Sequence, residues 1–461
     1  MNTSLTTLVE EMPLAHVVDS KFVDKVCAHC MISMWERDTQ EKLSRCGRCK
    51  FTHYCNMKCQ KKDWLTHKSL LQWSTHGMAV FDENDNIGSE SECSYLSRVA
   101  PRIPESMPRL IGRIIMKLRR CGDKSPAFNG RVFASLKSHT VDIEKDEEKR
   151  NGFIAIIHVI KDYLPFDKMP SNTEIFDIFC KILINALVIT DSCLNRIGLA
   201  VYLGLSALDH SCKPDAFIIF SGAKAILRSL NENITEYNDN LHIPYCDLLD
   251  LRSARCEALQ KQHNFVCNCD ICQDFDLDRQ KSSVRCTKCT DGFCPYSPDD
   301  DHTVKRCKVC HEISVFNSDH VQKLYQQLTA PRPAEKNLNE LIDLYHELEE
   351  VFSPYNVPLC KLAESIMISA LNNEKYDEAV EYAEKTLLCY RTYYPKGHPS
   401  PSVRMFEYAK LLMLQHNRES LPVLRKALKM ICESYGSESS FAFNAATLLS
   451  DLEKCVSTAS S

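Results

Sequence analysis

Apolar residues recur at helical spacing in the middle of the chain and towards its end. They repeat every three or four positions in Met107–Cys121, Phe153–Leu164 and Glu174–Thr190, which predicts a helix in each range. Residues 198–230 are denser in apolar residues and contain the runs AFIIF and AILRSL, which are typical of strands. From about His320 onwards the spacing is helical again. The pattern therefore predicts a mixed helical and stranded part followed by a helical part.

Polar segments interrupt this pattern. Residues 81–95 are polar and acidic and predict a surface loop, residues 138–150 form a charged break, and residues 231–242 predict another polar loop.

Within the helical part, Tyr376–Tyr394 aligns with Asn417–Tyr435 at an offset of 41 residues. A repeat near this length indicates stacked helix pairs of the tetratricopeptide kind. The alternative is an irregular helical bundle with a chance alignment.

Composition and charge are those of an ordinary globular protein. At roughly 100–200 residues per domain, 461 residues correspond to two to four domains. The 44% hydrophobic and 25% charged residues exclude a disordered, collagen-like or coiled-coil chain, and a net charge of −5 argues against a general polyanion binder. The apolar run Gly198–Leu208 is far too short to cross a bilayer, and the N-terminus lacks the pattern of a signal peptide. We therefore expect no membrane association.

Cysteine is the unusual part of the composition. Of 25 cysteines, 21 lie in residues 27–310, and many are paired at C-x2-C or tighter spacing. Without a secretory signal we expect a reducing compartment, in which disulfides are rare. Cysteine pairs at metal-ligand spacing then indicate zinc sites.

The first cysteine block lies in residues 27–67. Thiolates and imidazole suit tetrahedral zinc, and the block offers seven candidates, too many for one site and one short of two: Cys27, Cys30, Cys46, Cys49, Cys55, Cys59 and His67. We expect Cys55–His67 to be helical, with Cys55 and Cys59 on one face. Residues 25–68 also carry ten Lys or Arg against four Asp or Glu, which predicts a weak nucleic-acid contact or, alternatively, a solvated basic helix face.

This block resembles a MYND zinc finger, whose pattern is matched by Tyr54, Cys55, Cys59, Gln60, Trp64 and His67. The resemblance implies that Cys27, Cys30, Cys55 and Cys59 bind one zinc ion and that Cys46, Cys49 and His67 bind a second. The eighth ligand of the family is a cysteine four residues after the histidine, where this chain has Leu71. His76, Cys93 or water could complete the second site. Fingers of this type also imply binding of proline-rich peptides.

Three further segments resemble the SMYD family of SET and MYND domain-containing lysine methyltransferases. They are the sequence NRIGLAVYLGLSALDHSC at 195–212, IPYCDL at 243–248 and FVCNCDIC at 265–272. The finger, the SET segment, the post-SET cysteines and the helical end follow one another in the order of that family. The resemblance implies a methyltransferase that uses S-adenosylmethionine to modify lysines of histones or other proteins.

The resemblance also assigns roles to single residues. Tyr245 would be the catalytic tyrosine, which orients the reacting groups without a covalent intermediate. Asn185 and His210 would contact S-adenosylmethionine, and Phe265 would stack on its adenine. A post-SET zinc ion would be bound by four cysteines, Cys212, Cys267, Cys269 and Cys272.

Several positions depart from the family. Asp209 replaces the cofactor-binding asparagine, Asp215 replaces the asparagine after the proline, and Leu187 replaces an aromatic residue of the lysine channel. The 26 residues before Cys27 contain no glycine, so we expect the glycine-rich cofactor loop of the family to be missing. These departures favour an alternative function, a catalytically weak or inactive adaptor that binds partners in chromatin-associated complexes.

A last cluster has the spacing C-x2-C-x17-C-x2-C and consists of Cys286, Cys289, Cys307 and Cys310. This spacing predicts a four-thiolate zinc ribbon, in which Gly292 would supply a turn with positive φ. Alternatively, Cys294 or His311 replaces one of these ligands.

The expected fold is α+β: a β-rich SET core with an inserted finger, a post-SET zinc site, a zinc ribbon and a helical end, together holding three to four zinc ions. The expected boundaries are a residual SET strand at 1–24, the finger at 25–72, a helical insert at 73–197, the SET core at 198–262, the post-SET and ribbon region at 263–312, and the helical domain at 318–461. We expect a monomer in the nucleus and cytoplasm.

Overall fold

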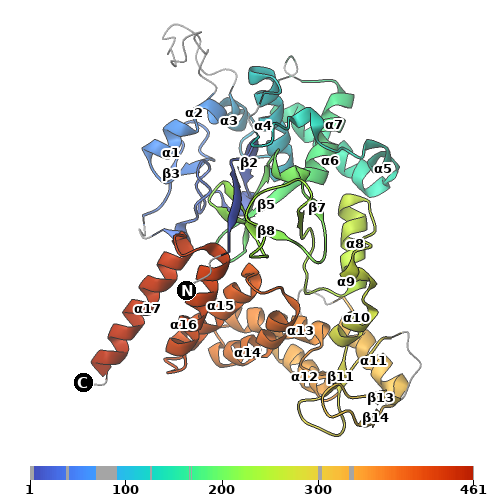
Figure 1. The fold of residues 1–461 in the computed structure, drawn as a ribbon. Coiled ribbons are helices and arrows are strands. Elements are labelled where there is room, and N and C mark those ends of the chain that lie inside the picture. Colours follow the sequence, from blue (N-terminus) through green and yellow to red (C-terminus); the bar gives the residue numbers. More distant parts are fainter. Residues whose placement is uncertain are drawn as a thin grey trace.

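A computed structural model describes residues 5–37, 41–68, 91–124, 127–165, 167, 169–298, 304–331 and 337–459. Two small sheets form the centre, with one group of helices on one side and the C-terminal helices on the other (Figure 1). This is the α+β architecture that the sequence predicts, and among the described residues no helix is long and apolar enough to cross a membrane.

The first sheet has the order β1-β9-β8 and the second the order β2-β6-β5. Their strands are β1 (Thr7–Glu11), β2 (Ala15–Val18), β5 (Ala186–Thr190), β6 (Arg196–Val201), β8 (Ala216–Ser221) and β9 (Lys224–Ser229). The two N-terminal strands thus pair with strands far along the chain, for example Val17 with Leu199. The strands predicted within 198–230 are confirmed as parts of β6, β8 and β9, and their apolar side chains pack into two buried cores.

The remaining strands are short pairs that shape the sites. They are β3 (Ser44–Arg45) with β4 (His53–Tyr54), β7 (Asp209–His210) with β10 (His242–Ile243), β11 (Val284–Arg285) with β12 (Phe293–Cys294), and β13 (Val304–Arg306) with β14 (Ile313–Val315). The β7–β10 pair is parallel, and it brings residues 209 and 210 next to the segment that leads to Tyr245.

Helices from the middle of the chain cover the β2-β6-β5 sheet (Figure 1). They are α3 (Glu92–Val99), α4 (Ser106–Cys121), α5 (Thr140–Lys145), α6 (Glu147–Tyr163) and α7 (Asn172–Asn185). The buried face of α4 includes Leu110, Ile111 and Ile114, as its periodicity predicts.

Three expectations for this region are wrong in part. The helix expected over Glu174–Thr190 ends at Asn185, because the β-branched run that follows pairs with β6 instead. The charged break at 138–150 contains α5 and the start of α6. Of the loop expected at 81–95, residues 81–90 lie outside the described residues, and Glu92 begins α3.

The last part of the chain is helical, as predicted. Its helices are α11 (Ser318–Thr329), α12 (Leu338–Glu349), α13 (Val357–Asn372), α14 (Tyr376–Tyr393), α15 (Pro399–Leu414), α16 (Ser420–Tyr435) and α17 (Ser440–Ala459). Three further helices lie before the predicted helical part: α8 (Arg252–His263), α9 (Asp270–Gln273) and α10 (Phe275–Lys281). From α12 onwards each helix packs against the next, and the two aligned sequence repeats correspond to α14 and α16. The tetratricopeptide class of these helices stays a prediction.

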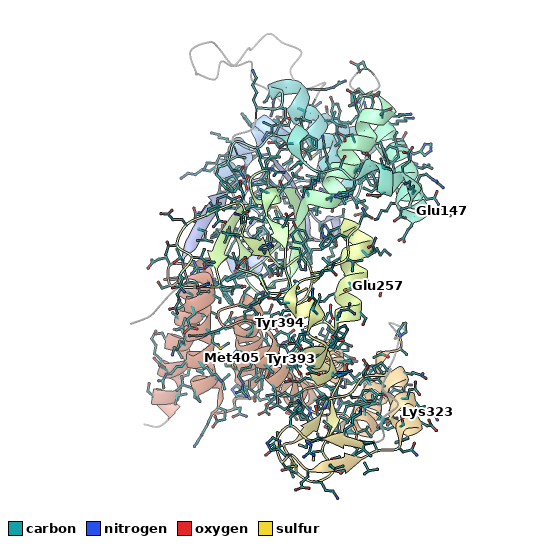
Figure 2. The ribbon with its side chains drawn as sticks, turned by 45° about the vertical axis from the view of Figure 1, so that its right-hand side comes forward. Glu147, Glu257, Lys323, Tyr393, Tyr394 and Met405 are labelled. Carbon is teal, nitrogen blue, oxygen red and sulfur yellow. The ribbon has the colours of Figure 1, made fainter. Side chains whose placement is uncertain are left out.

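The C-terminal helices pack against the first sheet and the segment after Tyr245. Phe217 and Ile219 of β8 share a buried core with Phe406 and Ile431. The Tyr394 hydroxyl donates to Asp247 Oδ1 at 2.5 Å. In Figure 2, Tyr393 and Tyr394 lie between the helix that carries Met405 and α8, which carries Glu257. Residues of the helical end therefore reach the neighbourhood of the candidate site.

Candidate functional site

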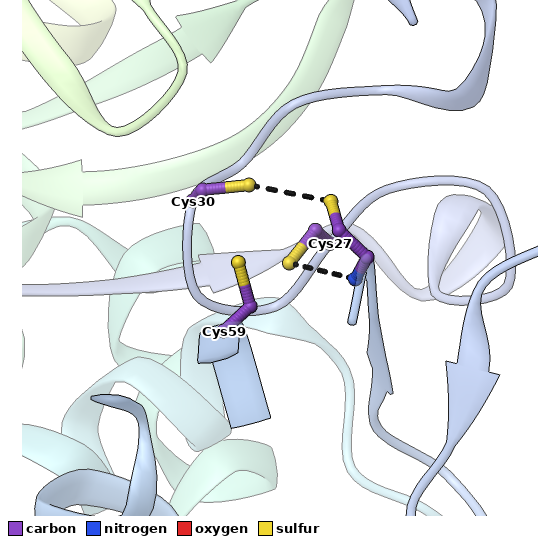
Figure 3. Close-up of side chains that lie close together, drawn as sticks. Cys27, Cys30 and Cys59 are labelled. Carbon is purple, nitrogen blue, oxygen red and sulfur yellow. Dashed lines mark hydrogen bonds between the residues drawn. The ribbon is translucent and has the colours of Figure 1, made fainter. Parts of the chain in front are cut away.

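The first cluster joins Cys27, Cys30, Cys55 and Cys59, whose sulfur atoms lie within 4.8 Å of one another. Cys30 Sγ lies 3.6 Å from Cys55 Sγ, and the Cys55 backbone N–H donates to Cys27 Sγ at 3.4 Å. In Figure 3 the side chains of Cys27, Cys30 and Cys59 converge on one point. Hydrogen bonds from Cys30 and Cys55 lower the pKa of the Cys27 thiol, so the cluster favours a thiolate, the form that binds zinc.

The helix expected over Cys55–His67 is two short helices. Asn56 caps α1 (Met57–Lys62) by accepting from the Cys59 N–H at 3.0 Å, so Cys55 precedes the helix and only Cys59 lies on it. The chain turns at Asp63, which accepts from the Tyr54 hydroxyl at 2.8 Å, and α2 (Trp64–His67) then presents His67. The two helices thus serve two different clusters.

The finger is held directly on the central sheets. The carbonyl of Cys30 accepts from the Ala223 N–H at 2.9 Å in the β8–β9 turn. Gly222 has a φ of +60° there, and a Cβ would lie 2.1 Å from the same carbonyl oxygen. Only glycine fits this contact, which ties the first cysteine cluster to the β8–β9 turn of the central sheets.

The second cluster contains Cys46, Cys49 and His67, as predicted from the family pairing, together with Cys93 from α3. All four side chains are buried. Leu71, at the position of the family cysteine, and His76, another candidate ligand, lie outside the described residues.

The third cluster brings together the four predicted post-SET cysteines, Cys212, Cys267, Cys269 and Cys272. Cys212 Sγ lies 3.6 Å from Cys272 Sγ. The buried Arg255 guanidinium donates to Cys272 Sγ at 3.7 Å, which offsets thiolate charge in the interior. Sequence reasoning missed Arg255, because an arginine at this position of a helix carries no pattern of its own.

The fourth cluster contains Cys286, Cys289, Cys307 and Cys310. Cys286 Sγ lies 3.7 Å from Cys310 Sγ, and Cys289 Sγ lies 3.9 Å from Cys307 Sγ. The expectation for Gly292 is wrong in its reason, because Gly292 has no positive φ. A Cβ on Gly292 would lie 2.3 Å from Cys289 Sγ and 2.6 Å from Cys307 Sγ, so the glycine makes room for the thiols.

The donor chemistry of all four clusters fits zinc. Each offers four sulfur or nitrogen atoms at the mutual distances that a tetrahedral ion requires. The described residues thus contain enough ligands for four zinc ions, the upper end of the expected range.

A cavity of about 440 Å³ lies among the predicted cofactor residues. Its wall includes Asn185 at the end of α7, Asp209 in β7, Tyr245 after β10 and Phe265 after α8. Leu187 lines the cavity, and His398 and Pro399 of the C-terminal part close another side. A volume of this size falls within the roughly 300–1,000 Å³ that small-molecule sites occupy. Residues from five separate parts of the sequence therefore form one enclosure.

Tyr245 is held at this cavity by two contacts. Its hydroxyl donates to the Leu208 carbonyl, and its backbone N–H donates to His210 Nδ1 at 3.0 Å. Burial, with a smaller effect of the Asp209 carboxylate, raises the pKa of Tyr245 to about 12. The hydroxyl therefore stays protonated near neutral pH.

His210 connects Tyr245 with the third metal cluster. Because its Nδ1 accepts from Tyr245, its Nε2 carries the proton and donates to Cys212 Sγ at 3.3 Å. The thiol of Cys246, which sequence reasoning did not single out, lies in the same group. The imidazole ring packs beside the cavity, with its centroid 5.9 Å from that of Phe265.

Asn185 lines the cavity, and its side-chain oxygen is available as a hydrogen-bond acceptor. Its amide nitrogen donates to the carbonyls of Lys137 at 2.8 Å and Lys181 at 2.7 Å. Both amide hydrogens are therefore used, which leaves Oδ1 to accept a hydrogen bond from a ligand.

The two aspartates that replace family asparagines lie in different surroundings. Asp209 is 72% exposed, and its Oδ1 lies 3.4 Å from Lys137 Nζ at the mouth of the cavity. Asp215 instead accepts from the backbone N–H of His242 at 3.0 Å and contacts His242 Nδ1 at 3.1 Å. Of the two, only Asp209 lines the cavity, so only this replacement would contact a ligand bound there.

Sequence reasoning missed His263, the last residue of α8. Its ring lies 4.7 Å from that of Tyr245, measured between centroids. Burial, and then the neighbouring His210, lower its pKa to about 4, so the ring is neutral near pH 7. Neutral aromatic rings around a cavity suit a ligand that carries a positive charge.

Comparison with known proteins gives two results. The MYND finger family model matches residues 27–70. The histone-lysine N-methyltransferase SMYD3 of Mus musculus is 25% identical over 450 residues, which cover 96% of this chain and 91% of that protein. The N-lysine methyltransferase SMYD2 of Homo sapiens is 26% identical over 403 residues, which cover 87% of this chain and 83% of that protein. The chain is thus similar to lysine methyltransferases over nearly its whole length.

Proposed function

The chain belongs to the SMYD family of SET and MYND domain-containing proteins, and on this basis we propose that it is a protein-lysine N-methyltransferase that uses S-adenosylmethionine. The observation that carries the proposal is the convergence of Asn185, Tyr245 and Phe265 on one cavity beside a four-cysteine cluster. These three residues come from distant segments of the sequence. The family resemblance identifies them by motif alone, without reference to their positions in space.

The residues present fit such a cofactor. When bound, S-adenosylmethionine supplies a methyl group on a positively charged sulfur. Asn185 Oδ1 is available to accept from an ammonium group, and Phe265 offers a face for stacking on a flat ring. The rings of Tyr245 and His263, which line the cavity, are neutral and would not repel the positively charged sulfur of the cofactor.

Methyl transfer requires a neutral lysine amine whose nitrogen forms a bond to the methyl carbon as the carbon–sulfur bond breaks. Tyr245 cannot take the lysine proton, because its pKa of about 12 keeps the phenol protonated. Its hydroxyl hydrogen is engaged by the Leu208 carbonyl, so the oxygen lone pairs remain to stabilise positive charge. Tyr245 therefore orients the reaction, and the lysine must lose its proton to water before or on entering the site.

We extend the proposal to lysines of histones or other proteins as substrates and to the nucleus and cytoplasm as locations. The finger would recruit partners, including proline-rich peptides, and a weak nucleic-acid contact would use the basic residues of segment 25–68. We also propose that the chain acts as a monomer.

A second candidate function is a non-catalytic adaptor, which one observation favours. Asp209 stands at the mouth of the cavity where the family has an asparagine, and an ionised carboxylate accepts but cannot donate hydrogen bonds. A pocket altered at this position could lose the cofactor and keep its shape, leaving the finger and the stacked helices as binding surfaces.

Titration of the zinc-loaded full chain with S-adenosylmethionine in a calorimeter distinguishes the two. We expect binding in the micromolar range, that is, about −8 kcal/mol, and transfer of a labelled methyl group to lysine-containing proteins. Tyr245→Phe should lower the transfer rate about 100-fold and leave cofactor affinity unchanged, because only the hydroxyl is removed. A folded, zinc-loaded chain that does not bind the cofactor would be an adaptor.

A further inference from the structure

The second metal cluster takes its fourth side chain from outside the finger. The family model matches residues 27–70, whereas Cys93 lies on α3, in the helical insert. We propose that Cys93 is the fourth zinc ligand of this cluster and replaces the family cysteine whose position is occupied by Leu71. This inference does not depend on the proposed methyltransferase activity.

The distances agree with tetrahedral zinc. Zinc–sulfur bonds of about 2.3 Å and zinc–nitrogen bonds of about 2.0 Å place neighbouring ligand atoms roughly 3.5–3.8 Å apart. Cys93 Sγ lies 3.7 Å from Cys46 Sγ, and Cys49 Sγ lies 3.5 Å from His67 Nε2. All four side chains are buried, and their ligand atoms lie within 4.8 Å of one another. The Cys93 sulfur thus occupies the place that a water ligand would need.

Glu92, the neighbour of Cys93 on α3, prepares His67 for the same ion. Glu92 Oε2 lies 2.9 Å from His67 Nδ1, which therefore carries a proton and leaves Nε2 to face Cys49. A carboxylate on the far nitrogen of a ligating histidine fixes its tautomer and orientation, as in many zinc sites. Arg113 in turn holds Glu92 with two hydrogen bonds, of 2.5 and 2.9 Å.

Hydrogen bonds fix the start of α3, so that the side chains of Glu92 and Cys93 point to the second cluster. The Ser91 hydroxyl caps the helix by accepting from the Ser94 N–H at 3.2 Å. Arg113, on α4, also donates to the His16 carbonyl in β2 at 2.5 Å. A zinc ion at this cluster would therefore join the finger, the helical insert and the central sheet through one buried network, and the finger would not be a self-contained module.

Zinc content of the full chain tests the assignment. Protein loaded with zinc and dialysed against a chelator at a concentration that the wild type withstands should retain four zinc ions per chain. Cys93→Ser should retain three. Cys180→Ser should retain four, because Cys180 is equally buried but lies outside the clusters. His76→Gln should also retain four. Four zinc ions in Cys93→Ser, or a loss in His76→Gln, would overturn the proposal.

A second variant keeps the test valid if Cys93→Ser does not fold. Cys93→His retains a ligand, so we expect it to hold four metal ions. After replacement of zinc by cobalt, its visible absorption should change, with weaker sulfur-to-cobalt charge transfer, because one thiolate becomes an imidazole. A cobalt spectrum identical to that of the wild type would show that residue 93 does not bind the metal.

Discussion

The Nδ1 atom of His67 lies 2.9 Å from Oε2 of Glu92, and each of these side chains is 1% exposed. Burial alone would raise the pKa of Glu92, but the Arg113 guanidinium and the hydrogen bond from His67 hold it well below its usual range. The Glu92 carboxylate is therefore charged although it is buried. Its two partners, His67 and Arg113, are buried as well. Removing Glu92 would leave His67 Nδ1 and two N–H groups of Arg113 without their acceptor.

We predict that Glu92→Ala destabilises the protein strongly. Breaking one partner of a buried ion pair costs about 3–5 kcal/mol, because Arg113 would stay buried without the carboxylate that pairs with it directly. The matched control is Glu148→Ala, whose salt bridge with Lys261 is exposed on both sides and contributes about 0–1 kcal/mol. Calorimetric melting of the zinc-loaded chains provides the comparison. Equal melting temperatures of the two variants would contradict this account.

A second prediction concerns Gly292 in the fourth cysteine cluster. In Gly292→Ala the new Cβ would lie 2.3 Å from Cys289 Sγ, so we expect loss of the zinc ion of that cluster. Gly47→Ala is the control, since Gly47 also sits between two zinc-cluster cysteines but a Cβ there meets no atom within 4 Å. Zinc counting by mass spectrometry should find one ion fewer in Gly292→Ala only. A full complement in both variants would show that the cluster can move its thiols aside.

A third prediction uses the two aspartates. Asp209→Asn restores an amide at the mouth of the cavity, and a hydrogen bond to a charged ligand group contributes about 1.5–3 kcal/mol. S-Adenosylmethionine should therefore bind about tenfold more tightly or better. Asp215→Asn, which changes the same side chain at a position bonded to His242, should leave the affinity unchanged. Calorimetric titration of both variants measures the difference, and an equal effect in both would assign it to charge at long range.

A fourth prediction concerns pH. Burial lowers the pKa of His398 to about 3, whereas the unfolded chain has a histidine pKa of about 6.5. Below pH 6.5 the unfolded chain therefore binds a proton that the folded chain does not, and stability falls as pH falls. The slope is about 1.4 kcal/mol per pH unit, or about 2 kcal/mol between pH 6.5 and 5.

His398→Asn should remove this contribution and keep the fold. His398 Nδ1 accepts from the Ser400 N–H at 3.3 Å at the start of α15, and asparagine can replace it as a cap without titrating. Denaturant unfolding at pH 7.5 and at pH 5 should show a smaller loss of stability for the variant than for the wild type. An equal loss would mean that His398 takes up a proton in the folded state.

The sequence predicted the parts of the fold that depend on local pattern. Strands within 198–230 and the helices after His320 follow from dense or periodic apolar residues. The helix expected over Glu174–Thr190 is too long, because Ala186–Thr190 is equally apolar and only pairing with β6 decides that it is a strand. Periodicity in a short apolar run does not carry that information.

In the candidate site, too, some features follow from local sequence pattern and others only from tertiary packing. Cysteines at fixed spacing do gather into clusters, since a short C-x2-C turn already brings two sulfurs together. Arg255, His263 and His398 reach their sites only through tertiary packing, and no motif marks them. Cys93 was one of the candidates for the second site, and tertiary packing decides that it joins the cluster. Gly292 is in the predicted cluster, but what it provides is space for two thiols rather than a left-handed turn.

The pairing of β1 with β9 has a consequence for synthesis of the protein. Thr7–Glu11 leaves the ribosome well before its hydrogen-bonding partner, Lys224–Ser229, which is made more than 200 residues later. Contacts between such distant segments form slowly, and unpaired strand edges attract other chains meanwhile. Until Lys224–Ser229 is made, the nascent chain lacks the strand that β1 pairs with in the folded protein, and we expect chaperones and the pace of elongation to affect its yield in cells.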